Sequence, residues 1–215
     1  MKDILPLFFL CGICHIVGAQ PTFQKVYFED SITLLSAIDQ TPDGGFVIGG
    51  GFSSRTVIFK VNEVGEVEWG TKTSAYGVFD IISAPDGSIY YLTGGDDAIG
   101  NARQVVVKLN QNGEKLWDMA LGTTLLGFYK SMSIDLDGNL LVTQSQLVQS
   151  QEFVFHKISP AGSLLWSKSF DVGLNSHAKS IVASLDGGYL VVGVASGKGV
   201  MMKTDENGEV EWVKQ

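Results

Sequence analysis

The stretch that decides the fold is residues 203–212, KTDENGEVEW, which ends in a tryptophan four residues after a glycine. The same spacing, with glycine five residues after a lysine and tryptophan four after the glycine, occurs four times. The four copies are Lys60, Gly65 and Trp69; Lys108, Gly113 and Trp117; Lys157, Gly162 and Trp166; and Lys203, Gly208 and Trp212. Their tryptophans lie 48, 49 and 46 residues apart, a period that predicts stacked structural units.

Upstream of each lysine the chain carries an Asp-Gly pair, at residues 43–44, 86–87, 137–138 and 186–187. Asp-Gly between two short apolar runs predicts a hairpin, because glycine accepts the positive φ that tight turns require. In the last repeat the expected strands are 178–184, 189–194, 200–205 and 210–214, and the other repeats match it segment by segment. The pattern predicts an all-β fold, an array of about four four-stranded antiparallel blades of the β-propeller type.

The repeats divide the chain into approximate units 28–74, 75–122, 123–171 and 172–215, with residues 23–27, FQKVY, as an orphan strand before them. The distance from the Asp of each Asp-Gly pair to the lysine is 17, 22, 20 and 17 residues, so the length variation is confined to one loop. Because the last unit has its own fourth strand, the orphan strand is not needed to close it, and we expect the chain to be part of a larger propeller; the alternative is a complete four-bladed ring. An open array leaves a terminal blade face uncovered, so we also expect self-association.

Residues 41–52, TPDGGFVIGGGF, and 184–194, SLDGGYLVVGV, resemble the Asp-Gly-Gly-Tyr repeats of exported bacterial β-propeller proteins. In that family such an array often precedes a small C-terminal sorting domain that the type IX secretion machinery reads. A more distant likeness is to quinoprotein propellers, whose repeats also end in G-x-x-x-W and whose tryptophan docks between blades. Their cofactor is not carried over, because that pattern usually has threonine before the glycine, whereas this chain has Val64, Asn112, Ala161 and Asn207.

Residues 1–19 have the layout of a signal peptide, with one lysine, an apolar stretch from residue 4 to residue 18, and small residues before Gln20. The apolar stretch is shorter than the ~20 residues that a membrane-spanning helix needs. Cleavage near Ala19 would remove both cysteines, Cys11 and Cys14, so we expect neither a disulfide nor a thiolate metal site in the mature chain. The prediction is a secreted, extracellular or cell-surface protein, with the periplasm as the alternative.

The net charge and the motifs that the sequence lacks exclude several classes of partner and of catalytic site. The net charge of −8 argues against nucleic acid or an anionic membrane surface as a partner. The sequence has no G-x-S-x-G, H-E-x-x-H or P-loop motif. Residues 135–139, DLDGN, lack the ligand spacing of an EF-hand loop, and His156 stands alone in a predicted strand. We therefore predict no catalytic residue, no metal and no cofactor.

The variable connections are all expected at one end of the blades, and loops on a rigid scaffold are where binding residues concentrate. The polar and aromatic candidates for ligand binding there are Tyr76, Asp96, Asp97, Asn101, Arg103, Phe128, Tyr129 and His177. The four repeated tryptophans are expected to pack between blades instead, because they occupy the same position in every unit.

These features predict a secreted binding or scaffold module, for a glycan or a cell-surface protein, because packing residues repeat without any catalytic motif. The alternative is an extracellular polysaccharide hydrolase or lyase, since two carboxylates at the right separation suffice for that chemistry.

Overall fold

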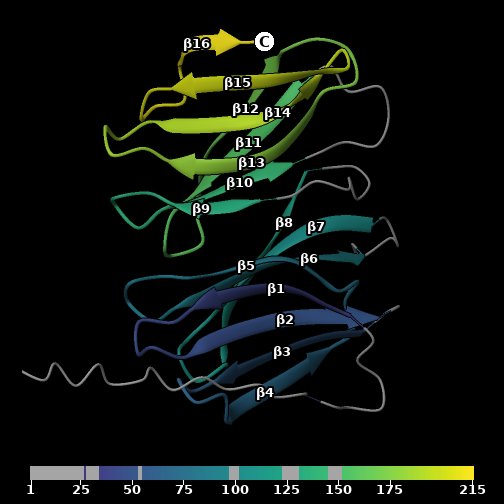
Figure 1. Cartoon of the computed structure of the whole chain (residues 1–215), viewed down its shortest axis with the longest axis vertical. Coiled ribbons are helices and arrows are strands. Elements are labelled where there is room, and N and C mark those ends of the chain that lie inside the picture. Colours follow the sequence, from purple (N-terminus) through teal and green to yellow (C-terminus); the bar gives the residue numbers. More distant parts are fainter. Residues whose placement is uncertain (1–26, 28–33, 53–54, 97–101, 123–130, 145–151) are drawn as a thin grey trace, which may run out of the picture.

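The computed structural model describes Tyr27 and residues 34–52, 55–96, 102–122, 131–144 and 152–215 (Figure 1). Within these residues it contains sixteen β-strands and no helix, grouped in four antiparallel sheets of four consecutive strands each. The predicted all-β, blade-like fold is thereby confirmed. None of the described residues belongs to a helix that is long and apolar enough to span a bilayer. The predicted signal peptide lies outside the described residues.

The four sheets, called blades 1 to 4 below, follow the sequence order. Blade 1 consists of β1 (Leu35–Gln40), β2 (Phe46–Phe52), β3 (Arg55–Val61) and β4 (Val67–Thr73). Blade 2 consists of β5 (Val78–Ser83), β6 (Ile89–Asp96), β7 (Ala102–Leu109) and β8 (Lys115–Leu121). Blade 3 consists of β9 (Met132–Ile134), β10 (Leu140–Gln144), β11 (Glu152–Ile158) and β12 (Leu164–Asp171). Blade 4 consists of β13 (His177–Ala183), β14 (Tyr189–Ala195), β15 (Lys198–Thr204) and β16 (Val210–Lys214).

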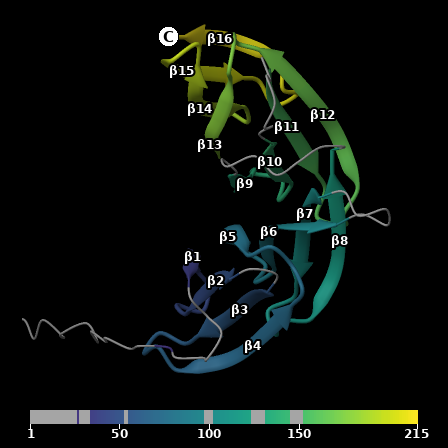
Figure 2. The ribbon, with the colours of Figure 1, turned by 90° about the vertical axis from the view of Figure 1, so that its right-hand side faces the viewer.

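The blades are arranged along an arc, with blades 1 and 4 at its two ends (Figures 1 and 2). The first strands, β1, β5, β9 and β13, line the inner side of the arc, and the fourth strands, β4, β8, β12 and β16, line the outer side (Figure 2). Contacts join β5 to β1 and β2, β9 to β5, and β13 to β9, β10 and β11. Each blade therefore packs face to face on its neighbour, as propeller blades do.

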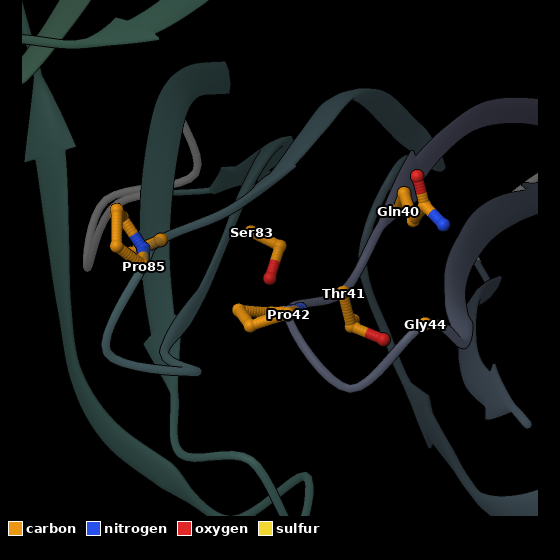
Figure 3. A pocket seen from close by; sticks show the side chains of 7 residues that line it. Gln40, Thr41, Pro42, Gly44, Ser83 and Pro85 are labelled. Carbon is orange, nitrogen blue, oxygen red and sulfur yellow. The ribbon is translucent and has the colours of Figure 1, made fainter.

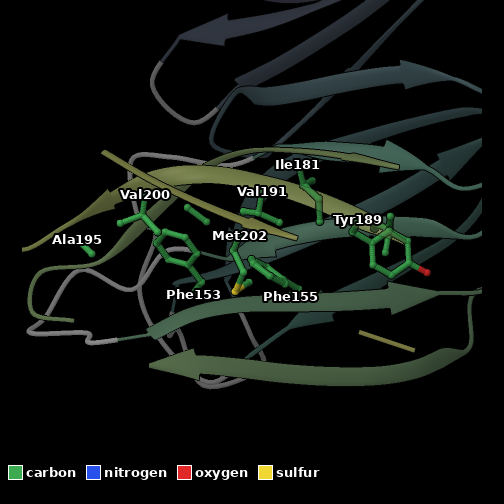
Figure 4. Packing of buried hydrophobic residues seen from close by; sticks show 10 residues of the cluster. Phe153, Phe155, Ile181, Tyr189, Val191, Ala195, Val200 and Met202 are labelled. Carbon is green, nitrogen blue, oxygen red and sulfur yellow. The ribbon is translucent and has the colours of Figure 1, made fainter. Parts of the chain in front are cut away.

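The core consists of the layers between neighbouring blades. Between blades 3 and 4, the Phe153 and Phe155 rings of β11 pack against Tyr189, Val191 and Met202 of blade 4 (Figure 4). All five side chains are buried. They alternate along their strands with residues of the opposite face, because successive side chains of a strand point to opposite sides of the sheet.

The Asp-Gly turns of blades 1 and 4 are stabilised by a lysine of the third strand. Lys60 Nζ lies 2.6 Å from the Asp43 carboxylate, and Lys203 Nζ lies 2.9 Å from that of Asp186. The hydrogen bonds from these lysines hold the pKa of both aspartates down at about 2. In blade 3 the lysine instead pairs with Asp135, two residues before its Asp-Gly pair, at 2.9 Å.

Each tryptophan of blades 1 to 3 lies on the turn between the third and fourth strands of the following blade. The indole N–H of Trp69 donates to Gln111 O at 2.9 Å, and that of Trp117 donates to Pro160 O at 3.1 Å. Glycine is required beneath the second ring, because Gly162 has φ +85° and a Cβ there would lie 3.0 Å from the indole. A repeated tryptophan and a repeated glycine thus form the contact between successive blades.

Candidate functional site

The two ends of the blades differ in chemistry. The turn end, on the left of Figure 1, carries the β1–β2 and β3–β4 type turns, whose backbone hydrogen bonds repeat from blade to blade. The loop end, on the right, carries the β2–β3 type connections and the links between blades. Hollows, charged side chains and buried polar groups are distributed differently over the two ends.

At the turn end, an open hollow of about 450 Å³ lies between blades 1 and 2 (Figure 3). It is lined by Gln40, Thr41, Pro42, Gly44, Ser83, Ala84 and Pro85. Two prolines and small side chains form most of this lining, and no charged side chain contributes to it. The hollow has little with which to orient a ligand.

A second turn-end hollow, of about 330 Å³, lies between blades 3 and 4. Two of its charged residues take part in a series of contacts: Lys157 pairs with Asp135 at 2.9 Å and donates to the Tyr189 hydroxyl at 2.8 Å. That hydroxyl in turn donates to Glu206 O at 2.9 Å. Burial alone would raise the pKa of Asp135, but hydrogen bonds from Lys157 and Asn139 outweigh it and lower that pKa. These contacts connect blades 3 and 4, so the groups that make them stabilise the fold.

Two carboxylates on the inner strands also have structural partners. Asp39 accepts the Ser83 N–H at 2.7 Å, which joins blade 1 to blade 2. Asp80 accepts the Met132 N–H at 2.7 Å, which joins blade 2 to blade 3, and also the Ile81 N–H at 2.9 Å. Burial raises the pKa of Asp80 to about 6. Across the described ranges, no group of three His, Cys, Asp or Glu side chains could hold a metal ion.

The loop end contains a layer of buried polar side chains between blades 2 and 3. Gln104 donates to Thr143 O at 3.1 Å, and His156 Nε2 lies 2.9 Å from Gln144 Oε1. Two atoms of this layer, Gln104 Oε1 and His156 Nδ1, have no hydrogen-bond partner among the residues that the structure describes. Burial lowers the pKa of His156 to about 4, so the imidazole is neutral at pH 7. The layer offers acceptor atoms to a donor such as a water or hydroxyl group.

The described candidates from the sequence lie at three successive blade junctions of the loop end. Tyr76 precedes β5 and is exposed, Arg103 lies on β7 and donates to Gly122 O at 2.8 Å, and His177 begins β13. Asp96 ends β6, while Asp97, Asn101, Phe128 and Tyr129 lie outside the described residues. Their role in ligand binding stays a prediction.

Sequence reasoning missed the buried polar layer. Gln104 and Gln144 each stand at the loop end of a strand that is otherwise mainly apolar, and this contrast is the signal that could have found them. His156, which stands alone in a predicted strand, is buried in β11.

Comparison with protein-family models finds no match to this sequence, and comparison with curated proteins finds none. Solved structures do match, and propeller-type folds are among them. The WD40 domain of Pan2 from Neurospora crassa matches with a TM-score of 0.57 and 14% identity, over 84% of this chain and 49% of that one. A Dyadobacter fermentans protein of unknown function matches with a TM-score of 0.55 and 10% identity, over 80% and 60% of the two chains. A glucose dehydrogenase also matches, with a TM-score of 0.55 and 10% identity, over 82% of this chain and 61% of that one.

The chain has a β-propeller-type fold. It spans between 49% and 61% of the length of these three structures. At such low identities the likeness concerns the fold, and the activities of the matched proteins are not transferred. The resemblance to exported bacterial repeats stays a prediction, because no family model matches.

Proposed function

We propose that this chain is an exported β-propeller module that binds an extracellular ligand, a glycan or a cell-surface protein, at its loop end. The propeller scaffold supports a binding role, because such scaffolds present loops of variable sequence on a rigid frame. Export rests on the signal-peptide layout of residues 1–19.

The observation that carries the proposal is the contrast between the two ends. At the turn end the repeated lysines and aspartates bond to each other, as Lys60 does with Asp43 and Lys203 with Asp186. At the loop end the residues differ from blade to blade, and they include an exposed tyrosine, Tyr76, and an arginine, Arg103. Tyrosine and arginine are enriched among the residues that dominate binding energy. The loop end is therefore the better candidate surface.

The two carboxylates of the inner strands, Asp39 and Asp80, give no support to the alternative of a polysaccharide hydrolase or lyase. Asp80 has the raised pKa that an acid catalyst needs. Its oxygens, however, accept two backbone N–H groups, and Asp39 accepts another. These carboxylates join blades rather than face a substrate.

The test is binding to a glycan array and to a panel of extracellular proteins, followed by variants at both ends. Tyr76→Ala and Arg103→Ala should each weaken binding at least tenfold. Leu185→Ala is the control, because this side chain is 92% exposed at the turn end of blade 4. The affinity of this variant for the ligand should equal that of the wild-type. Equal loss in all three variants would contradict a loop-end site, and release of products from a polysaccharide panel would contradict a pure binding role.

A further inference from the structure

The four Asp-Gly pairs lie in turns that have the same geometry at the glycine. Each of these glycines has a positive φ, between +80° and +90°. Each glycine N–H donates to the carbonyl three residues earlier, at 2.9 Å in blades 1 and 2 and at 3.0 Å in blades 3 and 4. The turns therefore differ in the surroundings of the aspartate and not in those of the glycine nitrogen.

The aspartates of blades 1, 2 and 4 are held by their own turns. Each accepts, on Oδ1, the backbone N–H two residues later: Asp43 that of Gly45 at 3.2 Å, Asp86 that of Ser88 at 2.8 Å, and Asp186 that of Gly188 at 3.1 Å. An aspartate that bonds to the backbone two residues on is a common way of fixing a turn. In blades 1 and 4 the lysine of the third strand pairs with the same carboxylate.

In blade 3 both of these contacts go to Asp135 instead. The Asn139 N–H donates to Asp135 Oδ1 at 2.8 Å, and Lys157 Nζ lies 2.9 Å from Asp135 Oδ2. Asp137 donates its backbone N–H to Asp135 Oδ1 at 3.0 Å. The Asp137 side chain is exposed, and in the part of the chain that the structure describes no hydrogen bond or ion pair holds its carboxylate. Of the four Asp-Gly aspartates, all of which are described, Asp137 alone has a side chain that its turn does not fix.

The hairpin that contains Asp137 also has the shortest first strand. β9 has three residues, whereas β1 and β5 have six and β13 has seven. Fewer ladder hydrogen bonds therefore hold the strand that enters this turn. Local opening has a free energy that depends on the contacts it breaks, so the turn of blade 3 can leave its hydrogen-bonded geometry more readily than the others.

An Asp-Gly pair can rearrange without an enzyme. The glycine nitrogen attacks Cγ of the uncharged aspartic acid, a C–N bond forms, and the nitrogen proton leaves with the carboxyl hydroxyl group as water. A water molecule then opens the resulting succinimide ring at either carbonyl carbon, which gives aspartate again or isoaspartate, in which the chain runs through the side-chain carbon. Glycine favours the ring, because it has no Cβ to obstruct the approach. Water is lost and then regained, so the residue keeps its mass.

The contacts of the aspartate decide how readily this ring forms. In blades 1 and 4 the hydrogen bond from the lysine holds the pKa of the aspartate at about 2, so the uncharged acid that reacts is rare. In blade 2, burial alone would raise the pKa of Asp86, but hydrogen bonds from Ser88 outweigh burial and lower it. Each of these carboxyl groups would also have to give up its hydrogen bonds before Cγ could turn towards the glycine nitrogen. No such contact restrains the Asp137 carboxyl group among the described residues.

We propose that Asp137–Gly138 is a site of spontaneous isoaspartate formation in the folded protein, and that the other three Asp-Gly pairs are protected from it. Isoaspartate at residue 137 lengthens the backbone by one carbon inside the turn that places Asp135. Asp135 pairs with Lys157, which also donates to the Tyr189 hydroxyl of blade 4. The modification therefore loosens the junction of blades 3 and 4, and it alters the turn-end hollow that Asp137 lines.

The first test is the ageing of the purified full chain at mildly acidic pH, both folded and in urea. Peptides are mapped by mass spectrometry with fragmentation that separates isoaspartate from aspartate, and deamidation of the Asn-Gly pairs at 112–113 and 207–208 is recognised by its change in mass. In the folded protein, isoaspartate should accumulate at least fivefold faster at residue 137 than at residues 43, 86 and 186. In urea the four rates should approach each other, because the restraints are lost. No preference for residue 137 in the folded protein, or the same preference in urea, would overturn the proposal.

The second test releases a protected aspartate. Lys203→Met removes the ammonium group that pairs with Asp186 and should raise the rate of isoaspartate formation there severalfold, while the rate at Asp43 stays unchanged. Lys60→Met is the reciprocal variant, with Asp186 as the unchanged site. A cooperative melt in circular dichroism shows which variants are folded, and either one suffices. Unchanged rates at the released aspartates would overturn the protection by ion pairs. Equal free energies of unfolding for the modified and unmodified protein, separated by chromatography, would overturn the effect on the junction of blades 3 and 4.

Discussion

Replacing Trp117 by alanine removes the contact between blades 2 and 3 at its centre. The indole lies on the Gly162 turn, donates to Pro160 O at 3.1 Å and lies 5.9 Å from the Tyr90 ring. It also packs against the buried cluster that blades 2 and 3 share. Because the substitution leaves a space that no neighbouring strand can fill without shifting, we expect a large loss of stability.

The magnitude follows from the area that the ring covers. An aromatic side chain at the low end of its usual burial removes ~150 Å² from water, which at ~25 cal/mol per Å² is ~4 kcal/mol. Trp117 is only partly buried, and alanine keeps one carbon, so the expected loss is about 3 kcal/mol. The lost hydrogen bond adds little, because water can rehydrate an exposed carbonyl. For a chain of this length the melting temperature should fall by about 6–12 °C.

The measurement is urea and thermal unfolding of Trp117→Ala beside Leu116→Ala. The control is the preceding residue of the same strand, so its side chain points to the other face of the blade, where it is 54% exposed. It should change the free energy of unfolding by less than ~0.5 kcal/mol. If the two variants lose the same stability, the indole does not join the blades, and the stacking argument is refuted.

Three further predictions concern a glycine, a carboxyl group and a buried ion pair. Gly162→Ala should destabilise more than Gly197→Ala in urea unfolding: both have positive φ, but only the first would place its Cβ against an indole. Asp80 binds a proton below about pH 6 in the folded state but only below ~4 when unfolded, so the wild-type loses stability as pH rises through this window. In urea titrations, the free energy of unfolding of Asp80→Asn relative to that of the wild-type should therefore rise by up to ~3 kcal/mol between pH 4 and pH 7. If that difference is the same at all pH values, the raised pKa is contradicted. Lys157→Met leaves the buried Asp135 carboxylate without its partner and should cost ~3 kcal/mol at pH 7, with much of the loss recovered in the double variant with Asp135→Asn.

The sequence predicts the blades well, because the signals for each strand are local. The last repeat was expected to have strands at 189–194 and 210–214, and the structure has β14 at Tyr189–Ala195 and β16 at Val210–Lys214. Asp-Gly turns and G-x-x-x-W spacings report hairpins whose partners lie within a few residues. Such features need no knowledge of how distant segments meet.

The partners across blades could not be predicted in the same way. The repeat gives Lys157 the same place as Lys60 and Lys203, but Lys157 pairs with Asp135 rather than with the aspartate of the Asp-Gly pair. The reason is that blade 3 has an aspartate where the other blades have Thr41, Ala84 and Ser184, so a nearer carboxylate is available. Contacts such as Gln104 with Thr143 O depend on which faces of two separate sheets meet, and no local pattern encodes that.

The departures from the repeat indicate where ligand binding should be sought. Positions that are alike in all blades, such as Gly65 and Trp69 with their counterparts, are used to join one blade to the next. The longest Asp-to-Lys spacing, 22 residues, falls in blade 2, and the buried polar layer around Gln104 and His156 lies at the loop end between blades 2 and 3. The longest connection and the buried polar side chains therefore lie at the same junction, and the packing of the blades requires neither. Because Arg103 lies at that same junction, its substitution is the variant with which the search for a ligand should begin.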